Sequence, residues 1–174
     1  VYLKFDCLHT LHGRALAQAE GLKAVNPDKR IVVFSGDGDC AGIGGNHLIH
    51  AAKRNVDMTV IMMSNYIYGM TGGQRAPTTP YGATTKTSPL GNEEHPFDMY
   101  KLVTGAGATF YARASVTNPV QLQHIIVSAM EHKGFSFIEV LSPCPTTAGR
   151  NIFNFKTPTE MYDWYAAQVC NAKN

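Results

Sequence analysis

The sequence predicts an α/β fold built on a mostly parallel sheet with helices on both faces. Short apolar runs rich in β-branched residues, typical of strands buried on both faces, alternate along the chain with longer segments of helical periodicity. Alternation of this kind implies right-handed βαβ units. The chain has 174 residues, of which 44% are hydrophobic, and no shift in composition divides it. We therefore expect one domain over residues 1–174.

Each element of this fold has its own signal in the sequence. Residues 14–25 are Ala-rich with apolar residues at helical spacing, and Asn26-Pro27-Asp28 ends this first helix. The apolar run at 31–36 predicts the first strand, and the next helix begins in the glycine-rich stretch near Gly42 and ends at Arg54. The run at 59–64 predicts the second strand. The same alternation predicts helices at 97–104 and 119–132 and strands at 109–114 and 136–141.

Charge and composition exclude several classes of protein. Fifteen Lys and Arg residues against thirteen Asp and Glu residues give a net charge of +2, without a basic run, so neither nucleic acid nor an anionic membrane is an expected partner. No stretch approaches the ~20 apolar residues of a membrane span, and the first residues do not resemble a signal peptide. The four cysteines form no Cys-x-x-Cys pair. A cytoplasmic protein with reduced thiols is expected.

The first strand ends in Ser35-Gly36-Asp37-Gly38-Asp39, and parallel sheets bind ligands at this end of their strands. A strand followed by Gly-x-Gly and a helix is the setting of a phosphate-binding turn, and with Ala41 it also satisfies the dinucleotide pattern. Two features argue against a dinucleotide. No acidic residue ends the second strand, and the Asp37 carboxylate would repel a diphosphate unless a cation lay between them.

The second strand supplies a partner for Asp37, because Asn65 follows it directly. Adjacent parallel strands should bring Asp37 and Asn65 side by side. A carboxylate oxygen, an amide oxygen and a backbone carbonyl just beyond Asn65 form an all-oxygen ligand set that suits Mg²⁺ shared with phosphate oxygens. The residues therefore predict a Mg-diphosphate ligand.

These residues also resemble a known family. Gly-Asp-Gly followed at this distance by Asn is the thiamine diphosphate motif, and GDGDCAGIGGNHLIHAAKRNVDMTVIMMSNYIYGMTGGQ is similar to the β subunit of 2-oxoacid:ferredoxin oxidoreductases. TLHGRALA upstream and LSPCPT downstream extend the resemblance, and CPTTAGRNIF with MYDWY is most similar to the 2-oxoglutarate branch. The resemblance implies the thiamine diphosphate-binding fold and oxidative decarboxylation of a 2-oxoacid with coenzyme A, yielding acyl-CoA, CO₂ and reduced ferredoxin.

The resemblance also implies the roles of individual residues. Asp37, the Asn65 side chain and the Ile67 carbonyl would bind Mg²⁺. Cys144 would be one ligand of a 4Fe-4S cluster. The family's other three cluster cysteines are absent, so we expect that the chain lacks its N-terminal cluster-binding segment; a lineage without the cluster is the alternative. No catalytic acid or base is assigned, since the family's belongs to the α subunit. The remaining cofactor-binding residues would be His12, Gly36, Gly38, Asp39, Gly69, Met70 and Thr71.

The expected partners are this α subunit, ferredoxin, a 2-oxoacid and coenzyme A. Residues 71–96 hold four prolines and four glycines without periodicity, and a loop of that kind should pack on the α subunit around the cofactor, unless it is an exposed surface loop. Other readings remain open. The substrate could be pyruvate or a branched 2-oxoacid, the enzyme could be a non-redox thiamine diphosphate decarboxylase or synthase, or the chain could be a binding subunit without turnover. Asp39 could instead cap a helix.

Overall fold

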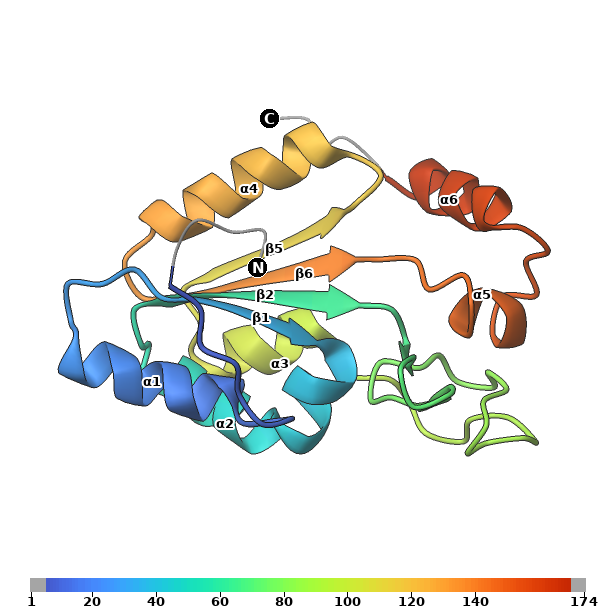
Figure 1. Ribbon diagram of the computed structural model, residues 1–174, viewed down its shortest axis with the longest axis horizontal. Helices are drawn as coiled ribbons and strands as arrows, with labels where there is room; N and C mark the ends of the chain where they lie inside the picture. The colour runs from blue at the N-terminus through green and yellow to red at the C-terminus, as the bar shows by residue number, and fades with distance from the viewer. Residues whose placement is uncertain (1–5, 170–174) are drawn as a thin grey trace.

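A four-stranded parallel sheet organises the computed structural model, which describes residues 6–169 (Figure 1). The strands lie in the order β1-β2-β6-β5, and every neighbouring pair is parallel. The observed strands begin and end within one residue of the predicted ones, which confirms the parallel α/β sheet. Their bounds are β1 Val32–Gly36, β2 Met58–Ser64, β5 Phe110–Ser115 and β6 Phe135–Leu141.

Helices cover both faces of this sheet, as expected (Figure 1). On one face, α1 (Ala15–Val25), α2 (Gly45–Lys53) and α3 (Met99–Ala106) pack on a core that includes Val60 and Phe137. On the other face, α4 (Pro119–Glu131) packs on Ile61, Ile138 and Val140. The strands are apolar on both faces because helices bury both of them.

The helix boundaries follow local capping chemistry. The Asp98 side chain accepts a hydrogen bond from the Lys101 N–H, so α3 begins two residues later than predicted. The helix is capped at its C-terminus by Gly107, whose φ of 119° is a conformation that favours glycine. A β-carbon added to Gly107 would also lie only 3.2 Å from the Ala52 carbonyl oxygen. Asn118 caps α4 in the same way as Asp98 caps α3, by accepting from the Gln121 N–H.

The largest difference from the predicted elements lies just after β1. A π-helical turn, η1 (Gly38–Ile43), begins there and leads into α2, whereas the sequence predicts a helix starting near Gly42. The turn begins early because the Asp37 side chain accepts the Gly38 N–H and caps it. At the end of the turn, the Gly44 N–H donates to the Asp39 carbonyl oxygen at 2.9 Å, so the Gly44 N–H is not free to bind a ligand.

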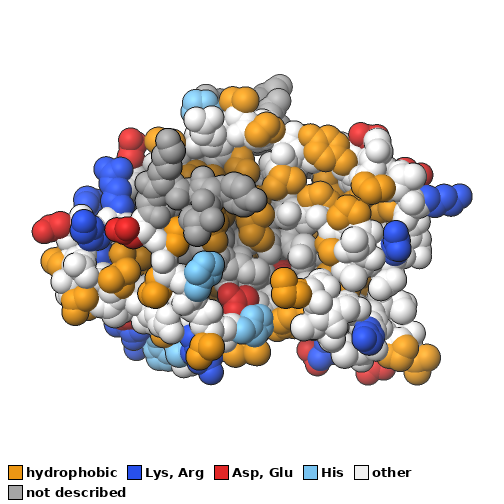
Figure 2. All heavy atoms as spheres, in the orientation of Figure 1, with side chains coloured by type: hydrophobic (Ala, Val, Ile, Leu, Met, Phe, Trp, Pro, Cys, Tyr) orange, Lys and Arg blue, Asp and Glu red, His pale blue; other side chains and the backbone are white. Residues whose placement is uncertain are grey.

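Several short elements lie beyond the carboxyl ends of the strands, and none of them is among the elements expected above. They are the antiparallel pair β3 (Ile67–Tyr68) and β4 (Gln74–Arg75), followed much later in the chain by α5 (Ala148–Asn151) and α6 (Pro158–Ala167). Figure 1 shows them on the side toward which the arrows of the sheet point. Hydrophobic side chains reach the surface over α6 (Figure 2), where Trp164 is 39% exposed.

The loop at residues 71–96 is mostly irregular, as expected, but it has an internal framework. The buried Asn92 side chain donates hydrogen bonds to the carbonyl oxygens of Thr79, Pro80 and Glu94. Thr78, Thr79 and Thr85 are buried as well. This part of the loop is therefore packed against the protein. No helix among residues 6–169 has the length and apolarity to cross a membrane.

Candidate functional site

Asp37 is the centre of the candidate site. It directly follows β1 and is 2% exposed. Its Oδ1 accepts the Gly38 N–H at 2.9 Å, and its Oδ2 accepts the Tyr66 N–H at 2.8 Å and the Thr78 hydroxyl. The carboxylate thus joins three segments: the turn after β1, the turn after β2 and the loop at 71–96.

Asp37 and Asn65 come together as predicted. Gly36 pairs with Met63 in the register of β1 and β2, so the chain leaves both strands at the same level. Asp37 binds the Tyr66 N–H, which directly follows Asn65, and Tyr66 has a φ of 67° that turns the chain back. The Asn65 amide oxygen accepts the Ile67 N–H at 3.1 Å. The three predicted Mg²⁺ ligands therefore belong to two adjacent segments, one after β1 and one after β2, that the Asp37 carboxylate joins.

No lysine or arginine among residues 6–169 forms an ion pair with Asp37. Burial raises the pKa of this carboxyl group, and the hydrogen bonds from Thr78, Tyr66 and Gly38 offset only part of the effect. A buried carboxylate without a counter-charge is costly, and a bound cation would remove that cost. The residues at this site therefore fit Mg²⁺, whose preferred ligands are oxygen atoms.

Asp39 holds His12 at the edge of the site. Its Oδ1 lies 2.9 Å from Nδ1 of His12 and also accepts the Gly13 N–H. Its Oδ2 accepts the Ser35 hydroxyl. Asp39 therefore does not cap a helix, which the sequence left as an alternative. Its contacts join the segment before α1 to the turn after β1, so His12 is brought next to the Gly-Asp-Gly motif.

Tyr68 packs directly on that motif. Its hydroxyl donates to the Gly38 carbonyl at 2.8 Å, and its ring centroid lies 5.9 Å from that of His12. A β-carbon at Gly38 would overlap the Tyr68 ring, and one at Gly42 would overlap the Tyr68 hydroxyl. Gly38 thus gives room to an aromatic ring of the protein itself. At Gly36 the nearest atom to such a β-carbon is 4.0 Å away, so that glycine borders open space.

The next predicted residues lie farther out. Met70 is fully exposed, and the Thr71 side chain is exposed and hydrogen-bonded to Gln74. Gly69 lies beside Cys144, since a β-carbon built on Gly69 would be 3.5 Å from the cysteine sulfur. The structure therefore groups His12, Gly38 and Asp39 near Asp37, while Met70 and Thr71 project from the rim.

Cys144 follows β6 and is partly buried. Its Sγ lies 2.9 Å from the Thr147 hydroxyl. Burial alone would raise the pKa of this thiol, but hydrogen bonds from Thr147, the Ala148 N–H and Thr146 lower it below its usual value. The environment thus favours the thiolate, the form that binds metals.

The described residues do not supply the rest of a 4Fe-4S site. No group of three or more His, Cys, Asp or Glu residues among 6–169 is placed to hold a metal. Cys7 is exposed, and burial raises the pKa of Cys40 to about 12. Cys170 lies outside the described residues. These residues alone therefore do not fit a cluster that needs four thiolates.

Three side chains that support the site were not singled out by the sequence pattern. The Thr78 hydroxyl donates a hydrogen bond to Asp37, and the Ser35 hydroxyl donates one to Asp39. The Thr147 hydroxyl is hydrogen-bonded to the Cys144 sulfur. Threonine and serine have no distinctive spacing here, so no local signal identifies them. Each reaches its partner through the tertiary fold or a tight turn.

The chain matches the family described as thiamine pyrophosphate enzyme, C-terminal TPP binding domain, over residues 2–140. It is 55% identical over 145 residues to the 2-oxoglutarate synthase subunit KorB of Archaeoglobus fulgidus, covering 83% of this chain and 54% of that protein. It is 52% identical over 172 residues to the protein of that name from Methanothermobacter marburgensis, covering 99% and 60%. The chain thus spans little more than half the length of these relatives.

A solved structure is also similar. It is the 2-oxoglutarate:ferredoxin oxidoreductase from Magnetococcus marinus with 2-oxoglutarate, coenzyme A and succinyl-CoA bound, and it superposes with a TM-score of 0.84 at 38% identity. The match covers 95% of this chain and 55% of that one. The Gly-Asp-Gly turn, Asn65 and the parallel sheet agree with the family match. The chain therefore belongs to the thiamine pyrophosphate enzymes, in the family of their C-terminal TPP-binding domain.

Proposed function

We propose that the chain is the thiamine diphosphate-binding β subunit of a 2-oxoglutarate:ferredoxin oxidoreductase. The reaction would be oxidative decarboxylation of 2-oxoglutarate with coenzyme A to acyl-CoA, CO₂ and reduced ferredoxin. The similarity to proteins named 2-oxoglutarate synthase supports this assignment. The observation that carries it is the buried Asp37 carboxylate, which has no counter-charge among the described residues and lies in a Gly-Asp-Gly turn beside Asn65.

Mg²⁺ would be held by Asp37, the Asn65 side chain and the Ile67 carbonyl. The diphosphate would lie against Gly36, Gly38 and Asp39. The open space at Gly36 supports this placement, because nothing in the described protein fills it. The remaining residues proposed to line the cofactor are His12, Gly69, Met70 and Thr71.

When bound, thiamine diphosphate supplies a carbanion that can add to a 2-oxo carbon and accept the electrons released as CO₂ leaves. The chain's own residues would position the metal and the cofactor. Asp37, held by Thr78 and the Tyr66 N–H, would fix the metal relative to both turns. Asp39 binds Nδ1 of His12, so Nε2 is the nitrogen that can face a ligand. The α subunit would contribute the acidic residue that activates the cofactor.

Electron transfer would need residues beyond those described. We propose that Cys144 contributes one thiolate to a 4Fe-4S cluster and that the other three ligands come from an N-terminal segment outside this single domain. The greater length of the relatives leaves room for such a segment. Ferredoxin would accept the electrons. We assign the reaction to the cytoplasm, where thiols stay reduced.

Mg-dependent binding of thiamine diphosphate to the Asp37→Ala variant tests the site. Calorimetric titration should show tight binding to the wild type in the presence of Mg²⁺ and none to the variant, with similar far-UV circular dichroism. Glu94→Gln, which alters an exposed carboxylate paired with Arg75, is the matched control and should bind as the wild type does. Unchanged affinity in Asp37→Ala would overturn the assignment.

Dye reduction by the complex tests the reaction. The complex isolated without oxygen should reduce a viologen dye when given 2-oxoglutarate and coenzyme A, and respond weakly to pyruvate and branched 2-oxoacids. A stronger response to one of those acids would mean that this acid, and not 2-oxoglutarate, is the substrate. Release of CO₂ without reduction of the dye would favour a non-redox decarboxylase.

A further inference from the structure

The loop at 71–96 contacts the candidate site through two neighbouring threonines. Thr78 is 4% exposed, and its hydroxyl donates a hydrogen bond to Oδ2 of Asp37. Thr79 is fully buried, and its hydroxyl donates to the Tyr66 carbonyl oxygen at 2.5 Å. Asp37 follows β1, and Tyr66 lies between β2 and β3. The two threonines therefore join the loop to both segments that carry the predicted Mg²⁺ ligands.

The loop itself supports the position of the Thr78 hydroxyl. On one side of Thr78, the Pro77 carbonyl oxygen accepts the Phe97 N–H at 2.9 Å. On the other side, the Thr79 carbonyl oxygen accepts a hydrogen bond from the Asn92 side chain at 2.9 Å. These two contacts tie the backbone around Thr78 to the far end of the loop. The hydroxyl thus reaches Asp37 from a backbone that is held on both sides.

The hydrogen bonds that Asp37 accepts are divided unequally between its two oxygens. Oδ2 accepts two, from the Tyr66 N–H and the Thr78 hydroxyl, whereas Oδ1 accepts one, from the Gly38 N–H. The Asn65 N–H is a fourth and weaker donor near this carboxyl group. Each oxygen of a carboxylate offers about two lone pairs. Oδ2 therefore has both of its lone pairs in use, and Oδ1 keeps the capacity to bind a cation.

Divalent cations differ in how they use a carboxylate. Ca²⁺ takes about six to eight oxygen ligands in a flexible geometry and readily binds both oxygens of one carboxylate. Mg²⁺ is smaller, demands octahedral geometry and keeps several waters, so a single carboxylate oxygen is enough for it. A carboxylate that offers only one oxygen therefore suits Mg²⁺ better than Ca²⁺.

We propose that Thr78 is a positioning residue that sets the cation specificity of the site. By occupying Oδ2 of Asp37, its hydroxyl leaves one carboxylate oxygen for the metal and so favours Mg²⁺ over Ca²⁺. Thr78 acts on the cation through Asp37. The inference rests on the proposed function, because it takes Asp37 as a ligand of the cofactor's metal ion.

Titration calorimetry of the full complex, with its α subunit, tests the proposal. The complex is freed of divalent cations and cofactor, supplied with thiamine diphosphate, and titrated with Mg²⁺ or with Ca²⁺. Thr78→Val removes the hydroxyl at nearly constant size, and Mg²⁺ affinity should fall about tenfold, as for the loss of an outer-shell partner. Ca²⁺ affinity should fall much less, because Oδ2 becomes available as a second ligand atom. Thr78→Ser keeps the hydroxyl and should keep the wild-type preference for Mg²⁺.

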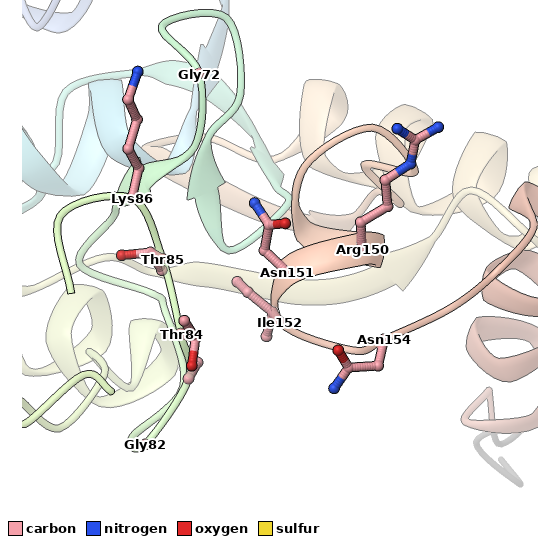
Figure 3. A pocket seen from close by; sticks show the side chains of 10 residues that line it. Gly72, Gly82, Thr84, Thr85, Lys86, Arg150, Asn151, Ile152 and Asn154 are labelled. Atoms are coloured by element: carbon pink, nitrogen blue, oxygen red, sulfur yellow. The ribbon is translucent and has the colours of Figure 1, made fainter. Parts of the chain in front are cut away.

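Thr85 provides a matched control in the same loop. It is 3% exposed, and its hydroxyl accepts the Ser88 N–H at 3.1 Å within the loop. Thr85 lines a cleft of about 680 Å³ whose walls also carry Lys86 and Arg150 (Figure 3). Its hydroxyl is not among the hydrogen-bond donors to Asp37. Thr85→Val makes the same chemical change as Thr78→Val and should leave the affinities for both cations at their wild-type values.

Three results would overturn the proposal. Equal losses of Mg²⁺ and Ca²⁺ affinity in Thr78→Val would show that Thr78 supports the site without selecting the cation. Unchanged Mg²⁺ affinity in this variant would show that its hydroxyl has no effect. The third result needs no variant, because a wild-type complex that binds Ca²⁺ as tightly as Mg²⁺ would have no preference for Thr78 to set.

Failure of this proposal and failure of the proposed function give different results. A wild-type complex that binds neither cation tightly in the presence of thiamine diphosphate would contradict the proposed function. A wild-type complex that binds Mg²⁺ tightly, with the same preference in Thr78→Val, would leave the proposed function in place and remove the role of Thr78.

Discussion

Two buried carboxylates in this protein have opposite surroundings. Glu139 lies in β6, is 3% exposed, and binds Arg113 at 2.9 Å and the Tyr111 hydroxyl at 2.7 Å. Asp37 follows β1 and is 2% exposed. It accepts hydrogen bonds from the Gly38 and Tyr66 N–H groups and the Thr78 hydroxyl, and no lysine or arginine among residues 6–169 pairs with it.

The difference shows what marks a candidate cation site. The two carboxylates are buried to nearly the same extent, so burial alone does not distinguish them. The protein neutralises Glu139 with its own arginine, and that pair joins β5 to β6. The described residues give Asp37 no such cation, so its charge is left for a ligand to neutralise. We infer that Glu139 stabilises the fold and that Asp37 holds a metal.

The largest expected effect is on cofactor affinity. Asp37→Asn removes the charge at nearly constant size, so Mg-dependent thiamine diphosphate affinity should fall at least about 100-fold, more than the loss of an outer-shell partner causes. Glu139→Gln should leave this affinity unchanged. Titration calorimetry measures both, and a comparable loss in Glu139→Gln would remove the distinction between the two carboxylates.

The next effect concerns stability. Arg113→Met leaves Glu139 buried without its cation and should lower the free energy of unfolding by about 2 kcal/mol, since the arginine is itself half-exposed. Urea denaturation measures this change. The double variant Arg113→Met with Glu139→Leu should recover part of the loss, because no unpaired charge remains. An unfolding curve for Arg113→Met that matches the wild type would contradict the structural role of Glu139.

The two glycines that flank Asp37 give a sharper contrast. Gly38→Ala pushes a methyl group into the Tyr68 ring and should cost about 1.5 kcal/mol of stability. Gly36→Ala has room and should leave the unfolding midpoint nearly unchanged. Adding Tyr68→Ala to Gly38→Ala should remove the steric conflict. Equal midpoints for the two single variants would show that the ring moves aside freely.

The smallest effect is a pH dependence. Burial raises the pKa of Asp37, and a protonated carboxyl group cannot bind Mg²⁺. Mg-dependent affinity should therefore fall as the pH decreases through this raised pKa, at a higher pH than for an exposed aspartate and by up to about tenfold per pH unit. Asp37→Asn should show only the pH dependence of the cofactor. An identical pH profile in both proteins would exclude Asp37 as the titrating ligand.

The sheet and the position of Asp37 beside Asn65 follow directly from the sequence. Continuous apolar runs mark the strands, and the ends of adjacent parallel strands must meet. The contact of Thr78 could not be predicted, because it depends on how a 26-residue irregular loop returns to the sheet. The contact of Tyr68 with Gly38 could not be predicted either, because it depends on the turn between β2 and β3. The π-helical turn was equally unpredictable, since it results from Asp37 capping Gly38.

Helix α6 did have a signal in the sequence. Thr157 precedes Pro158, and Glu160 follows three residues after Thr157, which is the pattern of a helix start. The Thr157 hydroxyl accepts the Glu160 N–H, and the Glu160 side chain reaches back to the Lys156 N–H. The cleft lined by Lys86 and Arg150 had no signal in the sequence. These two residues are 64 positions apart in the chain, and only the fold brings them together.

The most direct test of the central claim replaces Mg²⁺ with Mn²⁺ and follows it by electron paramagnetic resonance in the presence of thiamine diphosphate. The account predicts one tightly bound Mn²⁺ per subunit in the wild type and in Glu139→Gln, and none in Asp37→Asn. Retention of Mn²⁺ by Asp37→Asn, or its loss from Glu139→Gln alone, would contradict the assignment of the cation to Asp37.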